Sequence, residues 1–169
     1  DADDYQGYNH IHYSIENNEV ISKEPVSANW QLLFTRYFDY TIPYFVTGVQ
    51  MNSRYVMAQQ VDGINQNEYE NYTESNFNSN LSEIGSDWKT FDMGSFVYVV
   101  EDQRVYFTKN YNETITDSTY WKLYFTGFGG SADGKYSFTQ KEVGGTAIPE
   151  LSGVGALGYR QGGAGGHAL

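Results

Sequence analysis

Apolar and polar residues alternate through most of the first 143 positions, with the period of two expected for strands that bury one face. The clearest run covers residues 30–38, where Trp30, Leu32, Phe34 and Phe38 fall on alternate positions. We expect Trp30, Leu32 and Phe34 to fill the space between two sheets. The residues between them are expected to face outward or to cover a sheet edge: Gln31, Leu33, Tyr37.

Turn residues divide the alternating runs into hairpins. Four hairpins are expected: 8–15 with 20–22 across Asn17-Asn18, 44–51 with 54–61 across Asn52-Ser53, 95–100 with 104–110, and 120–128 with 135–143. In the last hairpin, Trp121, Leu123 and Phe125 alternate with Tyr120, Lys122 and Tyr124.

Residues 62–87 are polar and rich in Asn. Phe77, Leu81 and Ile84 are spaced four and three apart, which predicts a short helix over 76–84; the alternative is a long surface loop. The pattern as a whole predicts an all-β, antiparallel two-sheet sandwich with at most one short helix. We expect its core to hold the three indoles: Trp30, Trp88, Trp121.

The composition changes at Gly144. Residues 1–143 are expected to form one β domain, and the Gly-rich residues 144–169 a linker or tail. Within the tail, the mildly apolar segment 150–159 either docks as an edge strand or stays loose.

Charge and composition narrow the partners. The net charge of −11 repels phosphate, so we expect no nucleic-acid partner. No apolar run is long enough for a transmembrane helix, and the chain has no Cys. It begins at Asp1 without an apolar signal core, and Tyr, Asn and Thr are abundant. We therefore expect a processed protein that is extracellular or on the outer cell surface.

The chain is not expected to be an enzyme. It lacks a Gly-Ser-Gly elbow, and its only imidazoles are His10, His12 and His167. A hydrolase based on two carboxylates is the remaining catalytic alternative, because 21 acidic residues offer many pairs. On a strand, His10 and His12 point to the same side, where they either share a metal ion or are separately solvated.

Methionines are few. Met51 and Met57 lie in strand-like runs and are expected to pack in the interior. Met93 lies at an expected bend between Asp92 and Gly94, where a thioether serves either as a core plug or as an axial ligand for haem iron.

Several segments resemble the HmuY-like family of Bacteroidota. They are "HYSIENNEVIS" with "NWQLLFTRY", then "VDGINQNEYENY", "DWKTFDMGSF" and "YWKLYFTGFGG" with "GKYSFTQKEV", covering roughly residues 12–143. The segment "TAIPELSGVGALGY" resembles the linker that precedes a type IX secretion sorting domain. The resemblance implies a two-sheet β fold, export, and haem binding between two axial ligands.

The resemblance places Met93 at one axial position as the haem-iron ligand. The second ligand belongs in the loop after Gly63, which has neither His nor Met; Met57 or Met51 substitutes only with a rearranged geometry. A porphyrin also suits aromatic walls and arginines for its propionates. The candidates are Tyr40, Tyr44 and Tyr55 for the walls, and Arg36 and Arg54 for the propionates.

The sequence is compatible with two classes of function. One is a secreted, haemophore-like binding protein; the other is a structural or adhesive surface module that keeps the fold without haem. In the second class, Tyr-rich loops bind a protein or a glycan. In either class, edge strands offer a route to a homo-oligomer or a filament.

Overall fold

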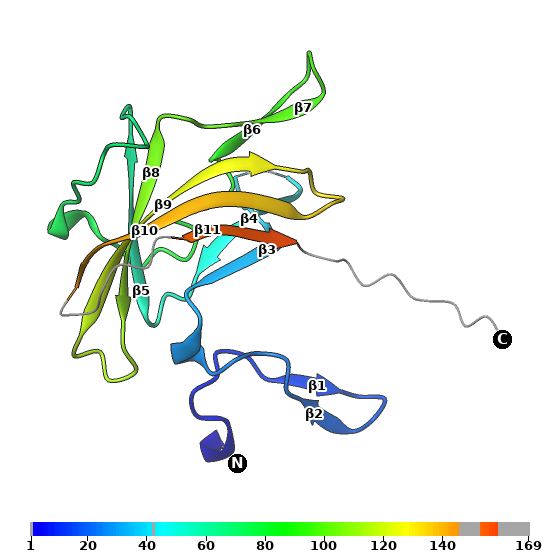
Figure 1. The fold of residues 1–169 in the computed structure, drawn as a ribbon. Helices are drawn as coiled ribbons and strands as arrows, with labels where there is room; N and C mark the ends of the chain where they lie inside the picture. Colours follow the sequence, from blue (N-terminus) through cyan, green and yellow to red (C-terminus); the bar gives the residue numbers. More distant parts are fainter. Residues whose placement is uncertain (1, 42, 146–152, 159–169) are drawn as a thin grey trace.

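The computed structural model describes residues 2–41, 43–145 and 153–158, and in this part of the chain the fold is all-β and sandwich-like, without an α-helix (Figure 1). Three 3₁₀ helices span Ala2–Tyr5, Ser27–Asn29 and Glu74–Asn76. The strands are β1 (His12–Ser14), β2 (Glu19–Ile21), β3 (Leu32–Phe38), β4 (Phe45–Met51), β5 (Val56–Asp62), β6 (Lys89–Asp92), β7 (Val97–Val100), β8 (Arg104–Tyr111), β9 (Ser118–Phe128), β10 (Lys135–Gly145) and β11 (Gly153–Gly158).

One antiparallel sheet forms the centre of the molecule, with the strand order β11-β10-β9-β8-β5. Three hairpins are separate two-stranded sheets: β1–β2, β3–β4 and β6–β7. The β3–β4 hairpin packs across one face of the central sheet. The β1–β2 and β6–β7 hairpins project from opposite ends of the molecule (Figure 1).

The main core lies between the central sheet and the β3–β4 layer. Trp88, which is only 1% exposed, stacks on Phe125 with ring centroids 3.9 Å apart. Its indole N–H donates to the carbonyl of Gly85 at 3.2 Å. The buried members of this core are Val49, Met51, Val56, Ala58, Ile84, Trp88, Tyr106, Leu123, Phe125, Tyr136 and Phe138, with Leu32 and Phe34 packed against them.

Residues 63–78 cover the opposite face of the central sheet. Phe77 packs with Val105 and Phe107 of β8 in a second buried cluster. The side-chain amide of Gln59 donates to the carbonyl of Thr73 and accepts from its N–H, at 3.0 and 3.1 Å. This loop therefore takes the place of a neighbouring strand beside β5 and protects that sheet edge.

The first and last expected hairpins are confirmed. β1 pairs with β2, and β9 pairs with β10 over most of their length. The alternation along β9 is also confirmed. Leu123 and Phe125 belong to the main core, whereas Tyr120 and Tyr124 pack against the second cluster.

The two middle hairpins were predicted wrongly. β4 pairs with β3, and β5 pairs with β8. Asn52, between β4 and β5, is buried, and its amide donates to the carbonyls of Ser27 and of Trp30. The chain at Asn52 is thus a corner that passes between layers. Similarly, β7 pairs with β6, and β8 enters the central sheet.

The expected helix over 76–84 is also wrong. Phe77 and Ile84 are buried in different clusters on opposite faces of the central sheet, so no single helix face joins them. Leu81 between them is exposed. The helical spacing arises because this segment crosses from one face of the sheet to the other.

Of the three indoles expected in the core, only that of Trp88 is fully buried; Trp30 and Trp121 are half-buried. Phe38, at the end of β3, is 45% exposed. The β3 alternation holds for Leu32 and Phe34, which pack against the core.

The expected boundary at Gly144 falls inside β10, which continues to Gly145. In the tail, the edge-strand alternative for 150–159 is confirmed over Gly153–Gly158, because β11 pairs antiparallel with β10. The other tail residues, 146–152 and 159–169, lie outside the described part of the chain.

Gly48 of β4 lies directly against the backbone of Gly85, which hydrogen-bonds to β4 on the side away from β3. A Cβ built there would lie 2.5 Å from the carbonyl oxygen of Gly85, and the neighbouring Val49 exchanges both backbone hydrogen bonds with Gly85. We expect Gly48→Ala to lower the free energy of unfolding by roughly 1–3 kcal/mol, because backbone atoms must move to admit the methyl group. Chemical denaturation measures this change.

Gly127→Ala is the matched control. Its Cβ would lie 3.5 Å from the Cβ of Ser137, which is an ordinary contact, in a strand where Ala is no worse than Gly. Equal destabilisation of both variants would contradict the close approach of the Gly48 and Gly85 backbones.

Candidate functional site

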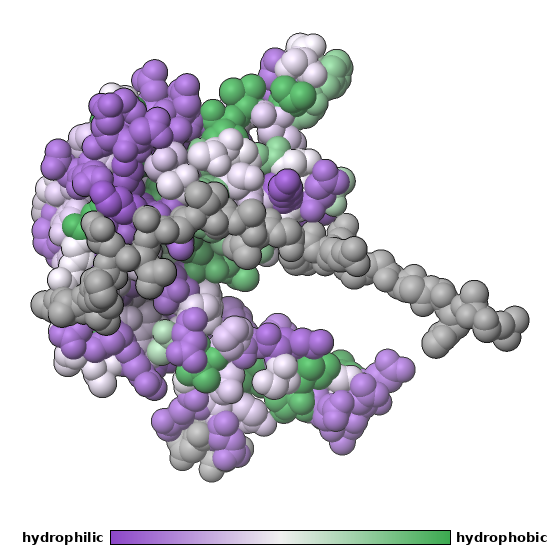
Figure 2. All heavy atoms as spheres, viewed as in Figure 1, coloured by the Kyte–Doolittle hydropathy of each residue, from purple (hydrophilic) through white to green (hydrophobic). Residues whose placement is uncertain are grey.

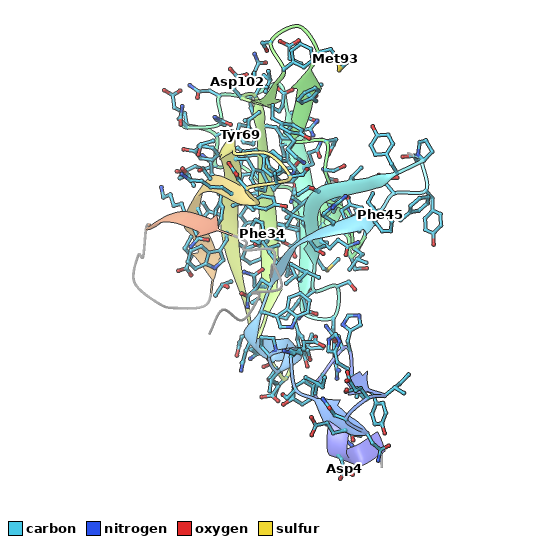
Figure 3. The ribbon with its side chains drawn as sticks, turned by 90° about the vertical axis from the view of Figure 1, so that its right-hand side faces the viewer. Asp4, Phe34, Phe45, Tyr69, Met93 and Asp102 are labelled. Atoms are coloured by element: carbon cyan, nitrogen blue, oxygen red, sulfur yellow. The ribbon has the colours of Figure 1, made fainter. Side chains whose placement is uncertain are left out.

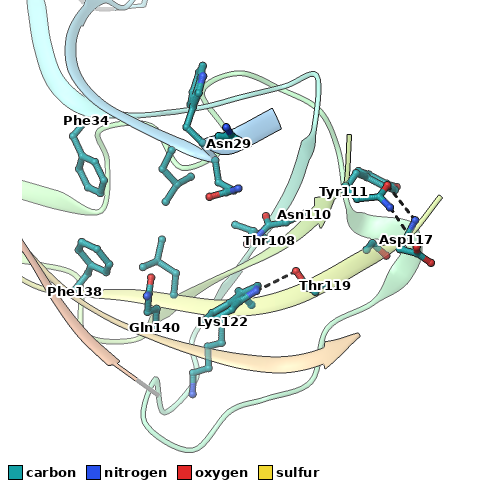
Figure 4. Close-up of a pocket in the computed structure, with 17 residues that line it drawn as sticks. Asn29, Phe34, Thr108, Asn110, Tyr111, Asp117, Thr119, Lys122, Phe138 and Gln140 are labelled. Carbon is teal, nitrogen blue, oxygen red and sulfur yellow. Dashed lines mark hydrogen bonds between the residues drawn. The ribbon is translucent and has the colours of Figure 1, made fainter. Parts of the chain in front are cut away.

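A cleft of about 910 Å³ opens between the start of β3 and the central sheet (Figure 4). We call it the Trp cleft, because Trp30 lines it from the β3 side and Trp121 from β9. Its lining is Asn29, Trp30, Gln31, Leu32, Phe34, Thr108, Asn110, Tyr111, Asn112, Asp117, Ser118, Thr119, Trp121, Lys122, Leu123, Phe138 and Gln140.

The cleft exists because the core-facing side of the sheet changes from apolar to polar along its strands. On β8 the core-facing residues run from Tyr106 to Thr108 and Asn110, and on β10 from Phe138 to Gln140. Polar side chains of this kind do not support a dry core. The apolar contact between the layers therefore stops here, and a polar floor remains under the β3 wall.

Two polar atoms at the cleft have no hydrogen-bond partner among the described residues. They are the indole nitrogen of Trp30 and the amide oxygen of Asn110, both fully buried as atoms. Buried donors and acceptors in native proteins are nearly always satisfied by protein, water or ligand. Because both atoms are closed to solvent, a ligand in the cleft would reach them only after a side chain moves, and the pair alone does not define a binding site.

The rest of the lining is held by internal contacts. The indole N–H of Trp121 donates to the hydroxyl of Thr119 at 3.2 Å (Figure 4). Asn112 organises the β8–β9 turn at the cleft mouth, where its side-chain oxygen accepts from the N–H of Thr116 at 3.0 Å. Its amide also donates to Asp117 at 3.3 Å. The mouth is thus shaped by the protein's own hydrogen bonds.

The cleft contains no cation that can meet a ligand's charge. Lys122 lines it only along its stem, because its ammonium group points away from the cleft and donates to the carbonyl of Asn67 at 3.3 Å (Figure 4). Burial lowers the pKa of this lysine. Asp117 is the one acidic residue of the lining, so the cleft favours neutral ligands over anions.

Four of the residues expected to bind haem, Met93, Met57, Tyr44 and Arg54, lie apart from one another. Met93 is in the tip between β6 and β7 and is 72% exposed, whereas Tyr44 precedes β4 and is 64% exposed. Arg54 follows β4, so the length of that strand separates it from Tyr44. Met57 is half-buried on the second-cluster face, where its sulfur accepts from the hydroxyl of Tyr111 at 3.6 Å. Figure 3 shows Met93 at the far end of the molecule from Asp4.

Other predicted residues do not complete a site around Met93. Met51 is buried in the main core, and His10 and His12 lie near the β1–β2 hairpin at the opposite end of the molecule. No cluster of three or more His, Cys, Asp or Glu that could hold a metal ion occurs among the described residues.

The Trp cleft does not have the donor set of a haem site. None of its lining residues, all of which the structure describes, is a His, Met or Cys. The phenol of Tyr111 is engaged with Met57 on the other side of the sheet. The aromatic surface of this cleft therefore lacks an axial iron ligand.

Exposed apolar side chains gather instead at two hairpin tips, of which the β6–β7 hairpin is visible at the top of Figure 2. The β6–β7 hairpin exposes Phe91, Met93, Phe96, Val97 and Val99, and the β3–β4 tip exposes Phe38, Tyr40, Tyr44 and Phe45. These sets are surface features without the polar groups of a pocket, so the Trp cleft is the stronger candidate for a small ligand.

The sequence did not reveal this cleft. Thr108, Asn110 and Gln140 look like outward-facing strand residues in the sequence. The available signal was the strand period: Thr108 and Gln140 lie two positions, and Asn110 four positions, from a core residue on the same strand face.

No family model, curated protein or solved structure matches the chain. In the described residues, no helix is long and apolar enough to span a membrane.

One strongly perturbed lysine lies between the two layers. The ammonium group of Lys89 donates to the carbonyls of Thr47 and Ser86 and lies 4.3 Å from the ring centroid of Trp88. Burial lowers the pKa of Lys89 from 10.5 to about 8.

This shift predicts a pH-dependent stability. Above pH 8 the folded protein releases the Lys89 proton that the unfolded chain keeps up to about 10.5, so the unfolding free energy rises over this interval. We expect the wild type to gain roughly 1–3 kcal/mol relative to Lys89→Met between pH 7.5 and 10. Urea titrations at several pH values measure the unfolding free energy of both proteins. The same dependence of this free energy on pH in both proteins would contradict the prediction.

Proposed function

We propose that the chain is a non-catalytic binding protein of the cell exterior whose Trp cleft holds a neutral glycan. The observation that carries this proposal is a cleft lined by two half-buried indoles and by several uncharged amide side chains, with Asp117 as its one carboxylate. Export is supported only by the sequence, through the abundance of Tyr, Asn and Thr and the resemblance to secreted HmuY-like proteins.

Aromatic rings supply one half of glycan recognition. A sugar ring has an apolar face of C–H groups that packs on an aromatic ring, and its hydroxyls project from the edge. Trp30 and Trp121 are both half-buried, which leaves indole surface for such packing.

Uncharged polar side chains supply the other half. Sugar hydroxyls both donate and accept, so they match amide groups, which also do both. The lining offers such groups from three separate parts of the chain: Asn29 and Gln31, Asn110, and Gln140. The hydroxyl of Thr108 adds to this set.

The same lining favours binding without hydrolysis. Most glycosidases use two carboxyl groups on either side of the scissile bond. The Trp cleft has only Asp117, and its carboxylate already accepts from Asn112. We therefore expect no turnover of a bound glycan.

Calorimetric titration with neutral and acidic oligosaccharides tests the proposal. We expect saturable binding of a neutral glycan and weaker binding of its acidic counterpart. We expect Trp121→Ala to weaken the affinity roughly 10-fold or more, because lost indole contact costs on the order of 1–3 kcal/mol. Asn110→Leu, which removes the unpaired acceptor, is expected to weaken binding similarly.

Tyr40→Ala is the control for nonspecific stacking, because Tyr40 is an exposed aromatic residue at the β3–β4 tip, away from the cleft. It should bind as the wild type does. If the folded protein binds no glycan at millimolar sugar, the proposed function is refuted. If binding depends on Tyr40 instead of Trp121, the glycan site lies on another surface.

Haem binding stays a separate prediction from the family resemblance, with Met93 as the expected iron ligand. Haemin titration tests it by the shift of the Soret band. If the resemblance extends to function, Met93→Ala should reduce the shift, whereas Met57→Leu should reduce it only if a rearranged geometry recruits this second sulfur. If haemin leaves the spectrum of the wild type unchanged, haem binding is excluded and the surface-module alternative is favoured.

A further inference from the structure

Two hairpin tips present large apolar side chains to solvent. We call residues 93–97 the β6–β7 tip, in which Met93, Phe96 and Val97 are exposed. At the β3–β4 tip, Tyr44 and Phe45 are exposed as well. A single exposed apolar residue needs no explanation, but several gathered at one place mark a surface that a partner covers.

Phe96 is held in a backbone conformation that bulky residues rarely adopt. Its φ is 57°, in the left-handed region, and its N–H donates to the carbonyl of Asp92 at 2.8 Å to close the turn. Among the described residues, its ring contacts that of Phe91 edge-on, with centroids 6.4 Å apart, and it remains exposed. A strained backbone that presents a phenyl ring to solvent indicates a functional surface.

The shape of the β6–β7 hairpin favours a fluid partner. Phe91 lies opposite Tyr98 on one face, and Val97 and Val99 lie on the other. Phe91, Val97 and Val99 are all exposed, so both faces of the hairpin are apolar. A flat protein surface would cover one of these faces, whereas the hydrocarbon of a lipid bilayer surrounds both.

The charge pattern also suits an uncharged apolar partner. No charged residue occurs in segments 93–100 and 40–53. The acidic residue that precedes each segment is bonded within its own turn. The carboxylate of Asp92 accepts from two backbone N–H groups at 3.0 and 3.2 Å, and that of Asp39 accepts from the N–H of Thr41 at 2.9 Å. These hydrogen bonds compensate both carboxylates, so neither tip offers a free charge to a charged partner.

Residues that suit lipid headgroups lie beside the apolar ones. Tyrosine is favoured at the interface between headgroups and acyl chains, and Tyr40 and Tyr44 are exposed next to Phe45. Arg36 is the only charged residue of β3 and is exposed two positions before Phe38, where its guanidinium can meet a lipid phosphate. The β3–β4 tip thus has apolar, aromatic and cationic groups in the order in which a bilayer would meet them.

Both tips project on the same side of the molecule. In Figure 3, Met93 lies at the upper end and the hairpin with Phe45 projects to the right, so one plane across the upper right of this view touches both tips. We propose that the β6–β7 and β3–β4 tips enter the surface of a zwitterionic lipid bilayer together, with Met93, Phe96 and Phe45 against its acyl chains. The lipid is zwitterionic because the net charge of −11 repels an anionic surface.

The β1–β2 hairpin provides an internal comparison. Ile15 is even more exposed than Phe96, and its hairpin lies at the opposite end of the molecule from β6–β7 (Figure 1). The turn beside Ile15, however, carries Glu16 and Glu19, which are both exposed. Because carboxylates are costly to place among acyl chains, this hairpin is expected to stay in water.

Sedimentation with phosphatidylcholine vesicles tests the proposal. We expect the wild type to bind, and Phe96→Asn to lower the partition coefficient roughly 10-fold, because the variant buries no phenyl ring. Asn adopts the left-handed conformation readily, so the turn is kept. Ile15→Asn is the matched control and should bind as the wild type does. Phosphatidylserine in the vesicles should weaken the binding of all three proteins.

Two results of this experiment would overturn the proposal. One is a folded wild type that does not bind phosphatidylcholine vesicles. The other is an equal loss of binding in Phe96→Asn and Ile15→Asn, with folding verified by circular dichroism, because adsorption would then not depend on the tips.

A fluorescent label reports which surface enters the bilayer. Because the chain has no Cys, Met93→Cys and Ile15→Cys each provide one thiol for an environment-sensitive fluorophore. We expect vesicles to shift the emission to the blue at position 93 and to leave it unchanged at position 15. Equal shifts at both positions would contradict insertion through the tips. A shift at position 93 that follows protein concentration without vesicles would show that a second copy covers the tips, and would overturn the lipid assignment.

Discussion

The structure depends on one contact, the packing of the β3–β4 layer over the central sheet through Gly48, Gly85 and Trp88. Gly48 and Gly85 allow two backbones to meet, and the indole of Trp88 fills the space beside them against Phe125. Because Val49 and Gly85 are hydrogen-bonded to each other, the segment 79–88 is tied to the same layer. Without this contact, the β3–β4 layer would no longer cover the main core, and the Trp cleft would lose the wall that β3 forms.

The strands themselves could be predicted from period and turn chemistry, but their partners could not. Asn52-Ser53 has the composition of a hairpin turn. Asn52 is nevertheless buried, at a corner where the chain leaves β4 in one layer and continues to β5 in the other. The choice between a hairpin and a corner depends on contacts with Ser27 and Trp30, more than twenty residues away. Such long-range contacts leave no local signal in the sequence.

The candidate site shows the same limit in a different form. Trp30 and Trp121 stand out in the sequence, and the alternation that places them on a core-facing strand side is correct for both strands. The alternation does not tell where the opposite layer ends, however. Trp88 is covered because Ile84, Phe125 and Tyr136 surround it, whereas Trp121 has Thr108 and Thr119 beside it and lies at the margin. What distinguishes a core indole from a cleft indole is the polarity of its neighbours on adjacent strands. Those neighbours can be identified only when the strand pairing is known.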